Sequence, residues 1–361
     1  MRIALAIFLG LAPIVPAAAQ QPPPAPAPDE FRVRVKVELV SVPLVVRDPS
    51  GEFVYDLSRR DVLLLDNGVP QQLNSFELAT QPLSLVILLD TSQRIAPLLD
   101  RVRQSGILFT NYILGVSGEA AVLTFDADVT VRQEFTSDPD KIIQAIQKIP
   151  AGGNASRLAD GLDQAVALLR QRPEGRRRVI VVVTEPRNQG SATPIGVPLR
   201  LAQLSDISIY TVALNPLEAD LRRRPEDTPV PRSPYPPGVF PAPGIPGSAQ
   251  TPTSQAQQQY ARADLLSAIM ILVRTLHDTA GQDVLELYAQ GTGGLNYSPF
   301  GRPALETALN QIGQDLHNQY LLTYRPSNLD EQGFHRIEVR VARPNVSVRT
   351  RPGYYVGLPP S

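Results

Sequence analysis

Residues 83–92 read LSLVILLDTS, and this stretch decides the fold of the chain. From Leu83 to Leu89 every residue except one serine is apolar, and the run ends at Asp90. A short run without polar alternation is typical of a parallel strand that helices cover on both faces. The stretch therefore predicts a central strand of an α/β sheet, with a carboxylate at its carboxyl end.

The segments that follow repeat this pattern and alternate with helical periodicity. Further apolar strands are expected at 120–125, 178–184, 207–213 and, briefly, 295–298. Amphipathic helices are expected at 98–113, 139–149, 158–169, 265–276, 284–290 and 304–316. This order predicts a doubly wound, mainly parallel sheet over about residues 82–318. Ligands of such sheets usually bind beyond the carboxyl ends of the strands, where Asp90 and Glu185 both lie.

Both ends of the chain show the alternation of half-buried strands instead. The first group, residues 31–80, begins with a strand at 31–38, and the phase slips near Leu39, which predicts a bulge. Asp66-Asn67-Gly68 predicts the turn of a hairpin with arms at 61–65 and 71–78. The second group, residues 319–356, has strands at 320–324, 337–341 and 346–349. Because neither group alone offers a two-layer core, we expect them to pack together as a small β-sandwich-like module.

The first residues predict export from the cytoplasm. Residues 1–19 combine Arg2, an apolar run and Ala17-Ala18-Ala19, as a cleaved signal peptide does. The alternative is an uncleaved membrane anchor, but about 17 interrupted apolar residues are short for a ~30 Å bilayer core. Residues 20–30 are a Pro-rich linker, and a second Pro-rich stretch at about 217–260 predicts a disordered insertion in the α/β domain. We therefore expect a periplasmic or secreted protein with no integral membrane segment after cleavage.

The composition excludes several classes of function. A formal net charge of -1 gives no electrostatic footprint for nucleic acid or for an anionic membrane surface. With 0 cysteines, the chain has no disulfide, zinc thiolate or cysteine nucleophile. His277, His317 and His335 are far apart and are expected at the surface, and the common enzyme signatures do not occur. The sequence therefore offers no conventional catalytic set.

Further stretches resemble a known family. They are DVLLLDNGVPQQLNSFEL at 61–78, AQGTGGLNYS at 289–298, QDLHNQYLLTYRPS at 314–327 and RPGYYV at 351–356. Together with LSLVILLDTS and the later strand that ends in Thr184-Glu185, they resemble the exported bacterial VWFA-related family. The resemblance implies a von Willebrand factor A-like (VWA-like) domain over about residues 82–312, with a metal-ion-dependent adhesion site at its top.

The resemblance also implies which residues form that site. Asp90 and Ser92 match the start of the family's Asp-x-Ser-x-Ser motif, and Ser156 stands at the position of its threonine. Two positions depart from the pattern, since Arg94 replaces the second serine and Glu185 replaces the usual aspartate. The predicted ligand set is therefore degenerate.

The replacement by Arg94 decides what the site can bind. Hydroxyl and carboxylate oxygens suit Mg²⁺, but a guanidinium cannot ligate a metal. A unit charge at ~5 Å from a divalent ion costs about 6–7 kcal/mol at an effective dielectric near 20. We favour an ion pair of Arg94 with Asp90 or Glu185 that takes the place of the metal, so that no cofactor is needed. In the alternative, Arg94 turns to solvent and Mg²⁺ binds.

The sequence favours binding over catalysis. We call the face formed by the loops at Asp90, Ser156 and Glu185 the top face. We expect it to recognise a protein or polysaccharide outside the cytoplasm. A structural part of a cell-envelope complex is the alternative, and a hydrolase is a weaker third hypothesis. Asp126 and Asp128 follow a strand and could border the same face, but we favour a solvated turn. Arg176-Arg177-Arg178 is interpreted as a solvated connection between a helix and a strand.

Overall fold

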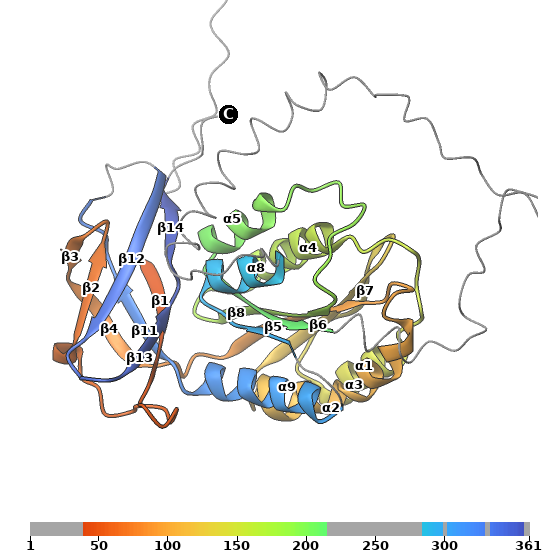
Figure 1. Ribbon diagram of the computed structural model, residues 1–361, viewed down its shortest axis with the longest axis horizontal. Coiled ribbons are helices and arrows are strands. Elements are labelled where there is room, and N and C mark those ends of the chain that lie inside the picture. The colour runs from red at the N-terminus through yellow and green to blue at the C-terminus, as the bar shows by residue number, and fades with distance from the viewer. Residues whose placement is uncertain (1–38, 215–283, 299–301, 329–332, 357–361) are drawn as a thin grey trace, which may run out of the picture.

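The computed structural model describes residues 39–214, 284–298, 302–328 and 333–356, which form an α/β domain and a β-module side by side (Figure 1). The expected signal peptide, Pro-rich linker, strand at 31–38, insertion at about 217–260 and helix at 265–276 lie outside the described residues. In the part of the chain that the structure describes, no helix has the length and apolar character needed to cross a membrane.

The α/β domain is built on a six-stranded sheet. Its strands are β5 (Leu83–Asp90), β6 (Glu119–Phe125), β7 (Val129–Thr136), β8 (Arg177–Thr184), β9 (Ile207–Ala213) and β10 (Asn296–Tyr297). Their order is β10-β9-β8-β5-β6-β7, and all neighbours are parallel except the β6–β7 pair. Every residue of β5 is buried, as its apolar run predicts, because β6 and β8 flank it and helices cover both faces.

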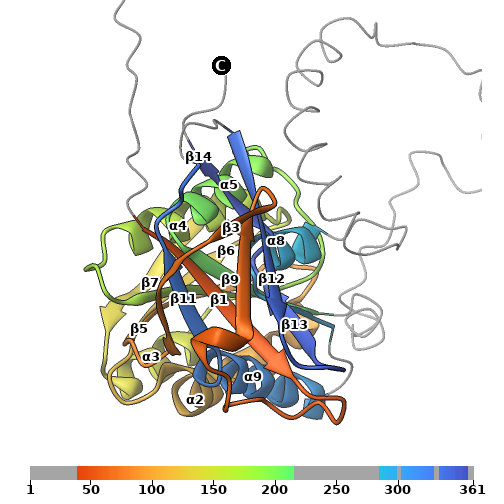
Figure 2. The same ribbon diagram turned by 90° about the vertical axis from the view of Figure 1, so that its left-hand side faces the viewer.

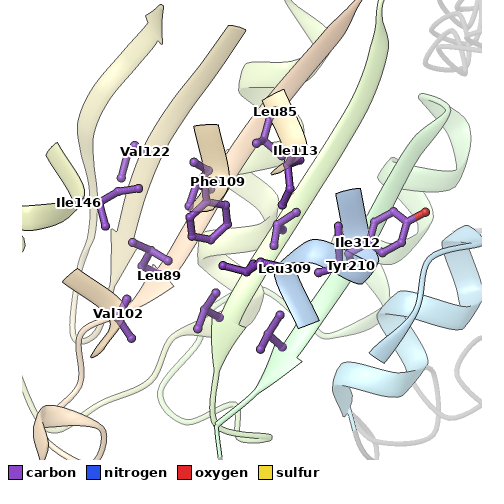
Figure 3. Packing of buried hydrophobic residues seen from close by; sticks show 14 of the residues in the cluster. Leu85, Leu89, Val102, Phe109, Ile113, Val122, Ile146, Tyr210, Leu309 and Ile312 are labelled. Carbon is purple, nitrogen blue, oxygen red and sulfur yellow. The ribbon is translucent and has the colours of Figure 1, made fainter. Parts of the chain in front are cut away.

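Helices cover the two faces of this sheet (Figure 1). One face carries η2 (Ala96–Leu98), α1 (Leu99–Gln104), α2 (Gly106–Leu108), η3 (Phe109–Leu114), α3 (Pro139–Gln147) and α9 (Arg302–His317). The other face carries α4 (Leu158–Arg170), α5 (Gly196–Leu204) and α8 (Val284–Thr292). Figure 3 shows the first layer, where Phe109 and Ile312 from helices meet Leu85 and Tyr210 from strands. The doubly wound sheet expected from the sequence is confirmed.

Three elements of the α/β domain differ from the sequence-based expectation. The single helix expected at 98–113 is broken, and its last turn, η3, is a π-helix. Its predicted apolar residues are nevertheless buried. The break falls where the Ser105 hydroxyl bonds the Val102 carbonyl oxygen at 2.6 Å, immediately before Gly106, a poor helix former. Strand β7 and helix α5 were not expected, because neither shows a clean apolar period.

The β-module takes strands from both ends of the chain. Its strands are β1 (Val40–Arg47), β2 (Val62–Asp66), β3 (Val69–Gln71), β4 (Leu73–Leu78), β11 (Tyr320–Tyr324), β12 (Gly333–Val341), β13 (Ser347–Thr350) and β14 (Gly353–Val356). They form two antiparallel sheets, β13-β1-β11-β4 and β14-β12-β2-β3. In Figure 2 the module lies in front of the α/β domain, and each sheet mixes early and late strands. The expected packing of the two groups is confirmed, with the α/β domain inserted between β4 and β11.

The hairpin turn of the module is also confirmed, with one correction. Asn67 and Gly68 have φ of 49° and 81°, the left-handed conformation that an Asn-Gly turn requires. Only β3 pairs with β2 after this turn, whereas β4 crosses to the other sheet and pairs with β11. The prediction that residues 71–78 form one continuous second arm is therefore wrong, because the chain passes from one sheet to the other between Gln71 and Leu73.

A buried polar network joins the two sheets of the module. The Asp66 carboxylate accepts hydrogen bonds from the hydroxyls of Tyr324 and Tyr354, both at 2.8 Å, and lies 2.8 Å from His335 Nδ1. Asp66 and His335 are 0% and 1% exposed, so the expectation that His335 lies at the surface is wrong. Burial raises the pKa of both tyrosines, which keeps them as neutral donors.

A second buried carboxylate fixes the module to the α/β domain. Asp315 of α9 is fully buried and pairs with Arg349 of β13 and, at 3.5 Å, with Arg47 of β1. It also accepts a hydrogen bond from the Tyr210 hydroxyl at 3.2 Å. One acid on the last helix thus contacts the central sheet and two strands of the module.

Candidate functional site

The predicted site residues meet at the carboxyl edge of the central sheet. Asp90 ends β5, Ser92 follows it, Glu185 follows β8, and Ser156 lies in the loop before α4. Their exposed fractions are only 0–2%, so the site is a closed cluster under the surface loops. We call these four residues and Arg94 the top site.

Asp90 is the centre of the top site. Its carboxylate accepts hydrogen bonds from Thr184 Oγ1 at 2.6 Å, from the Ser92 backbone N–H at 2.8 Å and from Ser156 Oγ at 3.2 Å. Burial raises the pKa of Asp90, and the nearby charge of Glu185 acts in the same direction, although these hydrogen bonds oppose the rise. Burial destabilises the charged form of this carboxylate, and acids perturbed in this way are common at functional sites.

Arg94 reaches across the top site to Glu185. Its Nε lies 2.7 Å from Glu185 Oε1 and 2.8 Å from Oε2, so both carboxylate oxygens face one guanidinium. The arginine side chain is 41% exposed, while the glutamate side chain is 3% exposed. Of the two pairings that the sequence left open, the structure shows the pair of Arg94 with Glu185. The guanidinium lies at the protein surface, and the carboxylate is buried.

The arrangement does not fit a divalent cation while Arg94 stays in place. The hydroxyls of Ser156 and Thr184 bond Asp90, and both oxygens of Glu185 face a positive charge. No group of three metal-binding His, Cys, Asp or Glu side chains is present among the described residues. The Ser92 Oγ is also buried in this cluster and has no hydrogen-bond partner among the described residues.

Of two further residues in this region, Thr184 was not identified from the sequence, and for Asp126 the less favoured of two interpretations applies. Thr184 precedes Glu185 and reads as the last residue of an apolar strand, yet its hydroxyl makes the shortest bond to Asp90. Asp126 was interpreted as part of a solvated turn, but it accepts a hydrogen bond from Thr91 Oγ1 at 2.7 Å. Desolvation would raise the pKa of Asp126, but this bond and backbone N–H donors outweigh it and hold the pKa below its usual range.

The loops above the top site are fastened to one another. A Cβ at Gly152 would lie 1.9 Å from Asp126 Oδ2, so only glycine lets this loop approach the carboxylate. Backbone hydrogen bonds join Gly152 to Thr91 and Ser156 to Gln189. The top face is therefore a preformed surface rather than a set of independent loops.

Comparisons with known proteins agree with this architecture. Residues 85–187, from β5 to just beyond Glu185, match the family model of the von Willebrand factor type A domain. Among curated proteins, none matches the sequence.

Three similar solved structures are bacterial. The conserved hypothetical protein BatB from Bacteroides thetaiotaomicron has 16% identity and a TM-score of 0.32, over 37% of this chain and 66% of BatB, just under two thirds. An aerotolerance-related membrane protein from Bacteroides fragilis has 15% identity and a TM-score of 0.39, over 64% and 98%. The vWF domain of the type V pili tip protein Mfa5 from Porphyromonas gingivalis has 19% identity and a TM-score of 0.27, over 29% and 38%.

The family match spans the strands that carry Asp90 and Glu185, and the observed sheet surrounds them with the doubly wound topology. Residues 85–187, within the α/β part of the chain, thus form a von Willebrand factor type A domain.

Proposed function

We propose that this chain is a non-enzymatic binding protein that recognises a protein or polysaccharide outside the cytoplasm through its top face. VWA domains are in general protein-interaction modules, which supports binding as the broad function. The single observation that carries the proposal is the pair of Arg94 and Glu185, which presents a half-exposed charge over buried acids at the strand ends. In this proposal the pair takes the place that a metal ion would hold, and the partner meets a guanidinium.

Site-specific photo-crosslinking in the native host tests this proposal. A crosslinking residue at Gln93, which is exposed beside the top site, should capture a partner, and Arg94→Ala should abolish that capture. The matched probe replaces Glu338 on β12 of the module, away from the top face. Capture only from Glu338 would instead favour the structural role in an envelope complex and would contradict top-face recognition.

Magnesium should not stabilise the wild-type protein. Because a ligand raises the melting temperature only by binding the folded state, millimolar Mg²⁺ or Mn²⁺ should leave the melting temperature unchanged. The double variant Arg94→Ser with Glu185→Asp removes the competing charge and adds a hydroxyl beside Asp90 and Ser92, so it should gain a metal-dependent rise. Stoichiometric magnesium binding by the wild type, measured by isothermal titration and tighter than millimolar, would show that the partner is bridged by metal.

A further inference from the structure

A cleft of about 670 Å³ separates the base of the α/β domain from the β-module. It lies at the amino ends of the parallel strands, opposite the top site, and its volume is within the usual range of small-molecule sites. Arg176, Arg177 and Arg178 line it from the α/β domain, and Ser41, Leu321 and Arg351 line it from the module. Both domains therefore contribute side chains to one cavity.

The arginine run at 176–178 is not the solvated connection that the sequence predicted. All three residues are only partly exposed, and the Arg176 side chain is 20% exposed. Four arginines and two acids, Glu174 and Asp206, line the cleft, so positive charge is in excess in a chain whose formal net charge is -1. Arginine is weakly hydrated and binds planar oxyanions through paired N–H groups, which makes it the side chain most suited to a buried anion site.

The acids near the cleft are shared among several arginines. Glu119 pairs with both Arg172 and Arg176. Arg177 lies near Asp315, which already holds Arg47 and Arg349. Glu119 and Asp315 are thus each divided between two or more cations, and the cationic charge at the base of the domain is not fully balanced.

Arg177 and Arg178 point to opposite faces of β8, as successive residues of a strand do. Arg177 bonds the carbonyl oxygen of Leu316 at the end of α9, and Arg178 bonds the carbonyl oxygens of Arg172 and Ser205. Each keeps one buried nitrogen with no hydrogen-bond partner among the described residues, Nη2 of Arg177 and Nε of Arg178. Arg178 makes no salt bridge to any described residue.

A buried guanidinium N–H group without an acceptor is costly, so the described groups around these two arginines do not fully satisfy them. Desolvation lowers the pKa of Arg177 to about 10, so the side chain is still charged at neutral pH but poorly solvated. Arg351, 6% exposed and paired with Asp206, adds a fixed charge from the module side.

We propose that this cleft is a binding site for a small multivalent oxyanion, a ligand that carries several carboxylate or phosphate groups and bridges the two domains. Arg178 and Arg177 face it from the α/β domain. Arg351, whose N–H groups already bond Ser41, Gln203, Gly353 and Asp206, forms part of the module wall. The site is independent of the top face, since it lies at the other edge of the sheet and contains none of the top-site residues.

Isothermal titration of the full chain at low ionic strength tests the proposal, with citrate and inorganic pyrophosphate as probes. Saturable binding of either probe is expected, and the preferred probe tells whether carboxylate or phosphate is the matching chemistry. Arg178→Gln should weaken binding at least tenfold, because it removes a cation of the cleft wall that makes no salt bridge within the described part of the chain. Arg340→Gln is the matched control, since Arg340 is an exposed arginine that pairs with Glu338 on β12, and it should leave binding within twofold of wild type.

A second variant keeps the test decisive if Arg178→Gln does not fold. Ser41→Glu places a carboxylate on the module wall of the cleft, where it should raise the melting temperature and abolish binding of both probes. Ser347→Glu, on an exposed strand position outside this cleft, should do neither. The proposal is overturned if wild type binds neither probe, if Arg340→Gln loses as much affinity as Arg178→Gln, or if Ser41→Glu binds like wild type.

Discussion

Replacing Asp66 with alanine should lower the free energy of unfolding by about 3–5 kcal/mol. The change removes the carboxylate acceptor shared by two tyrosine hydroxyls and His335, so each of these buried groups loses its bond to a charged acceptor. Because Tyr324 lies in one sheet and His335 in the other, the loss separates the two layers of the module. Urea unfolding followed by circular dichroism measures the effect.

Asp56→Ala is the matched control for this prediction. Asp56 also belongs to the module and pairs with Arg343, but its side chain is 73% exposed. The unfolding midpoint of this variant should stay close to that of wild type, because surface ion pairs contribute little. If both variants behave alike, the network around Asp66 does not hold the sheets together.

Removing the Asp315 carboxylate should have an effect of similar size, about 3–5 kcal/mol, for a different reason. Asp315→Ala leaves Arg349, Arg47 and the nearby Arg177 without their shared acid at the junction of the two domains. Like charges then face one another, so the module should detach from the α/β domain before either unfolds. Differential scanning calorimetry should show one transition for wild type and two for the variant.

The control for Asp315 is Asp100→Ala. Asp100 also lies on a helix and pairs with an arginine, Arg103, but its side chain is 82% exposed. A single transition at the wild-type temperature is expected. Two transitions in the wild type itself would show that Asp315 does not couple the domains.

Local patterns allowed much of the fold to be predicted. The burial of β5 and β8 could be predicted because both are runs of apolar residues. The positions of Asp90 and Glu185 could be predicted because the carboxyl ends of parallel strands meet at one edge of the sheet. The broken helix after Ile95 could not be predicted, because its apolar period continues across the break. What interrupts it is a hydroxyl of Ser105 and contacts with α3, which only the tertiary structure reveals.

Side-chain partners were harder to predict than elements. The sequence identified Arg94 as the departure from the family motif, but it left Asp90 and Glu185 as alternative partners. The choice of Glu185 depends on loop geometry. The contact of Asp126 with Thr91 crosses two strands that are adjacent in space and 35 positions apart in sequence. His335 gave no signal at all, since its partner Asp66 lies 269 positions earlier.

The interleaving of early and late strands gives the chain an order of assembly. Strands β1 to β4 leave the ribosome first, but their partners β11 to β14 follow only after the whole VWA domain has emerged. The strands and helices of the VWA domain all lie between β4 and β11 in the sequence. The VWA domain can therefore fold while the edges of the early strands are still unpaired. Closing the module requires contacts between residues far apart in sequence, which makes it the slow step of folding. The final strands thus complete the structure. A chain interrupted before Tyr320 would carry a folded VWA domain beside four strands that lack their pairing partners, a form that quality-control proteases can recognise.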